Sequence, residues 1–122
     1  MAVTKRFIFS DTRQLAADFG KSFGHPARVT MLSRLAQGGV ISYPSLIAGI
    51  ELRSSTIYDH IEKLERVGLV TRSLMSDNKA GYTLNFSLYR RMLNATRNQL
   101  NATAIVMEMY GAGDYEGLVG EG

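Results

Sequence analysis

Residues 43–70 carry a stripe of apolar side chains and an opposite face of small polar and basic ones. The segment reads YPSLIAGIELRSSTIYDHIEKLERVGLV. Ile57, Ile61 and Leu64 recur at i, i+4 and i+7, which predicts one buried stripe along a helix that opens at Ser54. The groups along the other side are Ser55, Thr56, Asp59, Lys63 and Arg66. A helix that is buried along one narrow apolar stripe and carries small polar and basic side chains on its opposite face can enter a DNA major groove.

The candidate DNA contacts are polar, basic or aromatic side chains in and around this helix. Its first hydroxyl side chains either bind phosphates and bases or simply cap the helix, and we favour DNA contact. Asp59 either accepts a hydrogen bond from cytosine or pairs with Lys63 at i+4, and the pairing is favoured. The full set is Tyr43, Ser45, Arg53, Ser54, Ser55, Thr56, Tyr58, Asp59, Lys63, Arg72 and Lys79.

The charge of the chain is distributed unevenly. The 122 residues, a length typical of one domain, carry 14 basic and 11 acidic groups. Residues 108–122 hold four of the acidic groups and no basic one, so residues 1–107 carry a net charge of +7. A basic body suits a polyanionic partner, although a merely solvated basic surface fits the charge equally well.

Several kinds of chemistry lack the residues they need. The chain has no cysteine and only two histidines, His25 and His60, so we expect no disulfide, no metal site and no cofactor. No catalytic constellation, phosphate-binding loop or dinucleotide fingerprint is visible, so we expect no enzyme. Nothing resembles a membrane span, and the apolar run at residues 7–9 is too short for a signal peptide. We therefore expect a cytoplasmic protein without membrane contact.

Turn and cap signals divide the chain into a series of short elements. Ser10 is expected to cap a first helix, Pro26 to open a second that stops at residues 37–39, and Pro44 to open a third. Residues 40–43 read as a short extended piece before that third helix. After the helix that ends at Gly68, residues 69–76 and 82–86 read as strands around a turn at residues 77–81. Helices followed by a hairpin predict a mainly α winged helix-turn-helix.

The last helix is expected to begin after a cap at Ser87 and to run to about residue 110. Its apolar band is wider than one neighbour needs, and several apolar residues are spaced by sevens, so it either pairs with a second subunit or lies buried in the core. The residues predicted at a dimer interface are Leu15, Phe19, Met92, Leu93, Leu100, Val106 and Met107. Residues 1–110 would then form a single domain, with 88–110 as the dimerisation helix and 111–122 as a flexible, acidic, glycine-rich tail.

Three stretches resemble the ArsR (arsenic-repressor-like) family of winged-helix regulators: residues 23–32, residues 54–64 and residues 68–70. The resemblance covers roughly residues 12–110 and implies DNA binding. The chain departs from the family's pattern at Glu51, where glycine is frequent, and at Asp59, where histidine is frequent. It also lacks the cysteine pairs and the last-helix histidine of the metal-sensing members, which argues against metal sensing.

These features predict a homodimeric, sequence-specific regulator, most simply a repressor, bound to a pseudo-palindromic DNA operator. The alternative is a winged-helix module that binds a protein through the same surface, to which Asp59 and Glu62 give slight support. The sequence leaves open whether an effector exists. A small molecule between the first and last helices, a protein inducer or no effector at all would each fit.

Overall fold

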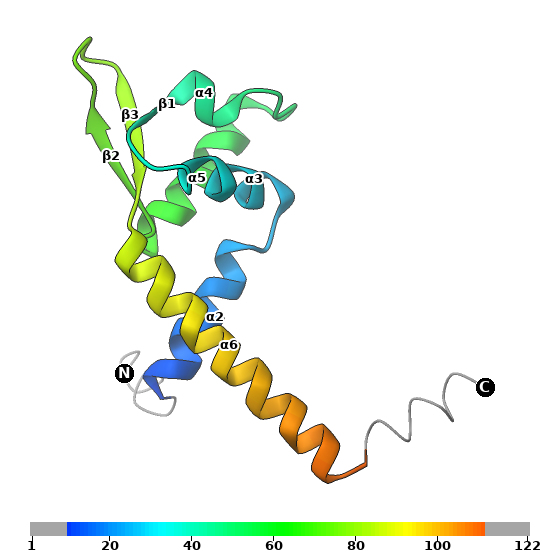
Figure 1. Ribbon diagram of the computed structural model, residues 1–122. Helices are drawn as coiled ribbons and strands as arrows, with labels where there is room; N and C mark the ends of the chain where they lie inside the picture. Colours follow the sequence, from blue (N-terminus) through cyan, green and yellow to red (C-terminus); the bar gives the residue numbers. More distant parts are fainter. Residues whose placement is uncertain (1–9, 112–122) are drawn as a thin grey trace, which may run out of the picture.

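The computed structural model describes residues 10–111, which form five helices and three short strands within that range. Figure 1 shows their arrangement. In chain order they are α2 (Asp11–Ser22), α3 (Pro26–Leu35), β1 (Ile41–Ser42), α4 (Tyr43–Ile47), α5 (Ser54–Arg66), β2 (Val70–Leu74), β3 (Ala80–Leu84) and α6 (Phe86–Met109). The acidic tail, apart from its first residue, lies outside the described residues.

Local side chains set the ends of the helices. The hydroxyl of Ser10 accepts from the Arg13 N–H and caps α2, as predicted. The Nδ1 atom of His25 accepts from the Ala27 N–H at 3.0 Å and caps α3, whose first residue is proline. At the end of α5, Gly68 has a φ of +88°, and the following N–H donates back to the carbonyl of Leu64. That pairing is a Schellman ending, which glycine adopts without steric cost.

The three strands form one antiparallel sheet in the order β1-β3-β2. Val70 pairs with Leu84 and Leu74 with Ala80, so β2 and β3 form the predicted hairpin. Ile41 pairs with Tyr82, so the predicted extended piece before α4 is the third strand. The sheet holds the segment leading into α4 against the hairpin.

Two predicted boundaries at the second hairpin strand were wrong. The strand spans residues 80–84 and not 82–86, because Asn85 leaves the ladder and its N–H donates to the carbonyl of Leu69. The cap of α6 is Asn85 and not Ser87, since the Asn85 side chain accepts from the Leu88 N–H at 3.1 Å. Phe86 therefore begins the helix and is exposed.

The core joins α3, α5 and the sheet. The predicted stripe of Ile57, Ile61 and Leu64 is fully buried, and it packs with the buried face of α3 and with Tyr82. Burying such a stripe is the main favourable contribution to holding a short helix in place. The stripe thereby fixes which face of α5 remains in solvent.

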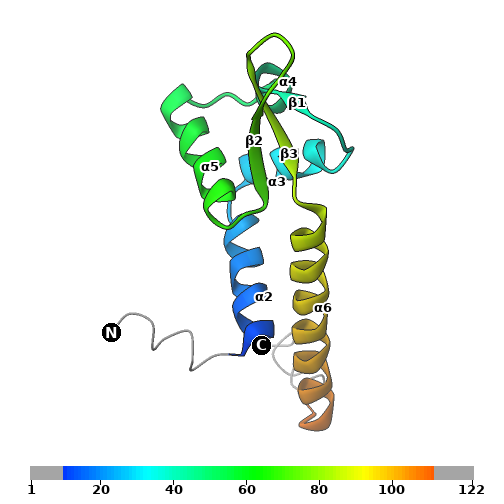
Figure 2. The same cartoon turned by 90° about the vertical axis from the view of Figure 1, so that its left-hand side faces the viewer.

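Helices α2 and α6 pack against each other along their lengths nearest the core. Phe19 lies edge-on to Phe23 and Tyr89, with ring centroids 4.8 and 5.1 Å away. Beyond this contact α6 continues past α2, as Figures 1 and 2 show, and residues 100–110 are all exposed. None of the helices in residues 10–111 is both long and apolar enough to span a membrane.

Candidate nucleic-acid interface

Helix α4, the start of α5 and the tip of the hairpin gather at one end of the molecule, and the free part of α6 lies at the other (Figures 1 and 2). Tyr43 and Thr56 are half-buried, and the rest of the predicted DNA-contact set is exposed: Ser45, Arg53, Ser54, Ser55, Tyr58, Asp59, Lys63, Arg72 and Lys79. The fold thus leaves the whole set accessible, on three elements that lie close together.

The N-terminus of α5 is uncapped by any side chain. Arg53 occupies the cap position in an extended conformation, and no side chain accepts from the first free N–H groups. Ser54 and Ser55 are exposed in the first turn. The capping alternative for these hydroxyls is therefore not what the structure adopts. Free N–H groups at a helix start, together with the helix dipole, favour an anionic group such as a phosphate.

Two tyrosines connect α4 to α5. The rings of Tyr43 and Tyr58 stack with centroids 5.0 Å apart and an angle of 11° between their planes. Burial raises the pKa of Tyr43, and the nearby Tyr58 hydroxyl raises it further, so Tyr43 stays neutral. Tyr58 is exposed on its other side. The stack fixes the position of α4 relative to the face of α5 that was predicted to read DNA.

Arg72 on β2 is held by neighbours within the chain. Its guanidinium lies 3.0 Å from a carboxylate oxygen of Glu65 and 5.6 Å from the centre of the Tyr82 ring. These two groups, Tyr82 first, raise the pKa of Arg72 further above its ordinary value. A DNA contact by Arg72 would have to share the guanidinium with Glu65.

The expected ion pair between Asp59 and Lys63 is not formed. Across residues 10–111 the ion pairs are Glu62–Arg66 and Glu65–Arg72. Lys63 instead lines a cleft toward α2 and α3. It lies about 13 Å from Ser54 along the helix axis, at a rise of about 1.5 Å per residue. The Asp59 carboxylate is exposed on α5 and forms no ion pair with any residue of the described range.

Local hydrogen bonds involve two other predicted contacts. The hydroxyl of Ser42 donates to that of Ser45 at 3.0 Å and also accepts from the Ser45 N–H, capping α4. At the hairpin tip the Lys79 N–H donates to a carboxylate oxygen of Asp77, while the Lys79 side chain is exposed. The tip therefore presents one cation on a backbone fixed by its own turn.

A buried polar pair behind α5 was not anticipated from the sequence. Arg28 on α3 is buried, and its Nη1 atom lies 2.6 Å from Nδ1 of His60 on α5. Burial lowers the pKa of His60, and the neighbouring His25, Arg28 and Lys63 lower it further. The imidazole is therefore neutral at pH 7 and accepts from the guanidinium. His60 flanks the predicted stripe, a position that favours a structural hydrogen-bonding residue, and Arg28 follows Pro26 by two residues, but neither position indicated the partner.

The residues predicted at a dimer interface fall into two groups. Phe19 and Met92 are buried within the single chain, and Leu15 and Leu93 are half-buried beside them. Leu100, Val106 and Met107 are exposed on the free part of α6. No cluster of three metal-binding side chains occurs within residues 10–111.

Helices α4 and α5, followed by a hairpin that pairs with the short strand before α4, define a winged helix-turn-helix. Residues 23–73 match the family model of a helix-turn-helix domain, and this range spans α3, α4, α5 and all but the last residue of β2. The second helix of that motif is α5. No curated protein sequence matches the chain.

Solved structures of similar fold confirm the predicted winged helix-turn-helix fold. An ArsR family transcriptional regulator superposes with a TM-score of 0.63 at 15% identity, covering 82% of this chain and 97% of that one. An ArsR-like regulator from Rhodococcus sp. RHA1 gives 0.59 at 19% identity, covering 88% and 95%. Rv0081 of M. tuberculosis gives 0.55 at 23% identity, covering 83% and 99%. The chain has the winged helix-turn-helix fold of ArsR-type regulators.

Proposed function

We propose that this chain is a cytoplasmic, homodimeric transcriptional repressor that binds double-stranded DNA without cysteine-based metal sensing. The observation that carries the proposal is the exposed polar and basic surface formed by α4, the uncapped start of α5 and the hairpin tip. The buried stripe of α5 fixes that surface outward. In helix-turn-helix proteins the equivalent helix enters the major groove while its neighbour crosses the phosphate backbone.

Each predicted contact has a role that follows from its place. Ser54 and Ser55 would meet a phosphate or a base edge at the helix start, with Arg53 beside them. Tyr58 would present its free edge to the groove, supported from behind by Tyr43. Lys79 would reach the sugar-phosphate backbone from the hairpin tip.

A second copy of the chain is part of the proposal because of α6. Its last part exposes Leu100, Val106 and Met107 together with Met109, which is 73% exposed. Leu100 and Met107 are seven residues apart and so share one side of the helix, and exposed apolar groups placed in this way are typical of a helix that pairs with a partner. Two recognition helices would then meet a pseudo-palindrome with half-sites about 34 Å apart.

The test is selection of bound duplexes from a random pool at two salt concentrations. We expect enrichment of an inverted repeat and an affinity that falls steeply with salt. Failure to bind any duplex at low salt would contradict the proposal. Binding of a protein partner in competition with DNA would favour the interaction module instead.

Single variants then locate the surface. Arg53→Ala is expected to weaken binding about tenfold, the loss of one charged hydrogen bond. Lys79→Ala should weaken it equally on all sequences and reduce the salt slope by about one. The matched control is Arg13→Ala, which removes an exposed arginine from α2 at the other end of the molecule. If Arg13→Ala weakens DNA binding as much as Arg53→Ala does, the loss of affinity reflects the net charge and not a local contact.

A further inference from the structure

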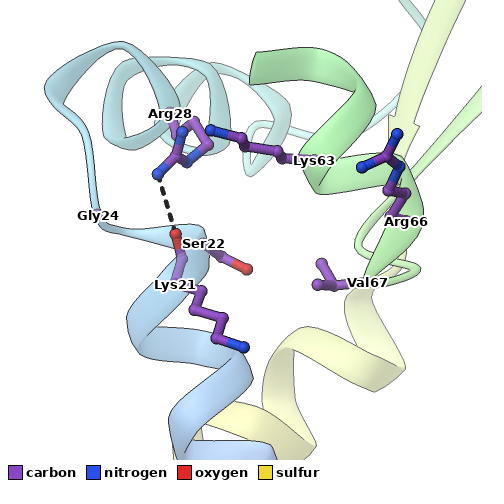
Figure 3. A pocket seen from close by; sticks show the side chains of 7 residues that line it. All are labelled: Lys21, Ser22, Gly24, Arg28, Lys63, Arg66 and Val67. Carbon is purple, nitrogen blue, oxygen red and sulfur yellow. Dashed lines mark hydrogen bonds between the residues drawn. The ribbon is translucent and has the colours of Figure 1, made fainter. Parts of the chain in front are cut away.

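A cationic cleft lies where α2, α3 and α5 meet. Its volume is about 520 Å³, within the range of small-molecule sites. The lining residues are Lys21, Ser22, Gly24, Arg28, Lys63, Arg66 and Val67, with no carboxylate among them. In Figure 3, Lys21 and Ser22 reach in from α2, Lys63 extends toward Arg28, and Val67 closes the opposite wall. Lys21, Arg28 and Lys63 thus face one space, and Arg66 lies at its rim.

Arg28 is the buried floor of this cleft. Only 7% of its surface is exposed, yet no carboxylate pairs with it anywhere in residues 10–111. One Nη atom contacts His60 and the other donates to the Lys21 carbonyl at 3.1 Å, while Nε has no partner. A buried charge is ordinarily paired, because removing it from water without a partner is costly. Arg28 has the hydrogen bonds that orient it but lacks the countercharge.

The backbone is shaped to keep Arg28 in this place. A Cβ added at Gly24 would lie 3.0 Å from the Nη2 atom of Arg28 and 3.1 Å from the Lys21 carbonyl oxygen. A side chain there would crowd the hydrogen bond that ties α3 to the end of α2. The guanidinium is thereby preorganised at the cleft and not merely folded onto a surface.

Neighbouring groups show how little negative charge the cleft contains. Glu62 pairs with Arg66 at the rim, on the exposed side of α5. The hydroxyl of Ser22 donates to the backbone carbonyl of Asp18 at 2.9 Å. Lys21 and Lys63 have no ion-pair partner within residues 10–111. The ammonium groups of Lys21 and Lys63 are therefore available to a ligand.

We propose that this cleft binds the phosphate group of a small organic phosphate. A phosphate monoester carries nearly two negative charges at pH 7 and accepts several hydrogen bonds, which suits Lys21, Lys63 and the edge of Arg28. The cavity exceeds the volume of one phosphate, and Val67 offers an apolar wall for the organic part of the molecule.

The position of the cleft gives the ligand a consequence for α5. Lys63 and Arg66 belong to α5, whereas Lys21 belongs to α2, which packs on α6. A bound anion would join the two helices by charge and bias the orientation of α5. This regulatory consequence rests on the proposed DNA binding; the anion site does not.

Calorimetric titration of the intact protein with glycerol 3-phosphate, at constant ionic strength in chloride, tests the site. We expect saturable binding that Lys21→Gln and Lys63→Gln each weaken about tenfold, as expected for one charged hydrogen bond. Both side chains are exposed, so these variants keep the core intact. The matched control is Lys79→Gln, which removes the same charge from the hairpin tip and should bind as the unchanged protein does.

Further arms separate the sources of the anion. Inorganic phosphate should bind more weakly than glycerol 3-phosphate, and citrate more weakly still. Absence of saturable binding, or equal losses in Lys21→Gln and Lys79→Gln, would overturn the site. If duplex DNA displaces the ligand and Lys21→Gln weakens DNA binding as much as Arg53→Ala, the cleft belongs to the DNA surface and the proposal fails. Phosphate binding in a protein that ignores all DNA would support the site and refute the proposed regulator.

Discussion

The ring of Tyr43 lies flat on that of Tyr58, with centroids 5.0 Å apart and planes 11° from parallel. This contact joins α4, a five-residue helix too short to be stable alone, to α5. We expect Tyr43→Leu and Tyr58→Leu each to destabilise the fold, with a coupling of about 1 kcal/mol in a double-mutant cycle measured by urea unfolding. Purely additive effects would mean that the stack contributes nothing beyond burial.

The neutral state of His60 makes stability depend on pH. Burial and nearby cations lower its folded pKa below the ordinary 6.5, while Asp59 opposes the shift. His60 therefore takes up a proton more readily in the unfolded chain than in the folded one. The stability contributed by the neutral imidazole is complete above pH 6.5 and is lost as pH falls through the folded pKa. We expect the free energy of unfolding to decline below pH 6.5.

The variant that tests this is His60→Asn, which retains an acceptor near Arg28 but cannot be protonated. It should be less stable at pH 7 and show a shallower decline on acidification, measured by urea unfolding at a series of pH values. His25→Asn, in which asparagine can still cap α3, removes only one of the groups that lower the pKa of His60 and should change the slope less than His60→Asn does. An unchanged slope in His60→Asn would assign the decline to other groups.

Two glycines should respond to alanine with opposite signs. Gly68 ends α5 at a φ of +88°, and a Cβ there would lie 3.3 Å from the Leu88 side chain. Gly68→Ala should destabilise the protein by about 1–2 kcal/mol. Gly20 lies within α2 and is exposed, and a Cβ added there would meet nothing within 4 Å. Gly20→Ala should stabilise the protein by about 0.5–1 kcal/mol in thermal or urea unfolding.

The proposed dimer is tested on the free part of α6. Leu100 is 64% exposed there. Leu100→Asp should shift the protein toward monomer in sedimentation equilibrium and weaken binding to a two-half-site duplex, since a charge opposes apolar burial. Asn98→Asp adds the same charge on another face of the helix and should remain dimeric. A monomeric starting protein, or dissociation in both variants, would refute this interface.

The sequence was most informative where periodicity and caps act locally. The stripe of α5, the Ser10 cap and the hairpin each depend on neighbouring residues, and the structure confirms them. The second strand was misplaced because alternation at Tyr82, Leu84 and Phe86 continues through the point where Asn85 turns the chain into α6. An alternating pattern that includes Phe86 cannot reveal that the preceding residue, Asn85, already caps a helix.

The long-range polar contacts could not be read from the sequence. Arg28 and His60 are 32 residues apart, and only the packing of α3 on α5 brings them together. Spacing at i+4 suggested a partner for Asp59, but Lys63 turns toward Arg28, as Figure 3 shows. The side chain of a long residue on a helix surface has several rotamers, and tertiary surroundings choose between them.

Ser42 ends β1, where it pairs with Gly81 of the hairpin, and it also caps α4. One residue therefore belongs both to the sheet and to the helix that precedes α5. Because Gly81 lies beside Ala80, whose pair with Leu74 is the last before the turn, a twist of the outer part of the hairpin would be passed to α4 without an intervening loop. The hairpin, α4 and α5 should thus tilt together as one rigid body. Adaptation to DNA grooves of different width would then be confined to the hairpin tip beyond Leu74.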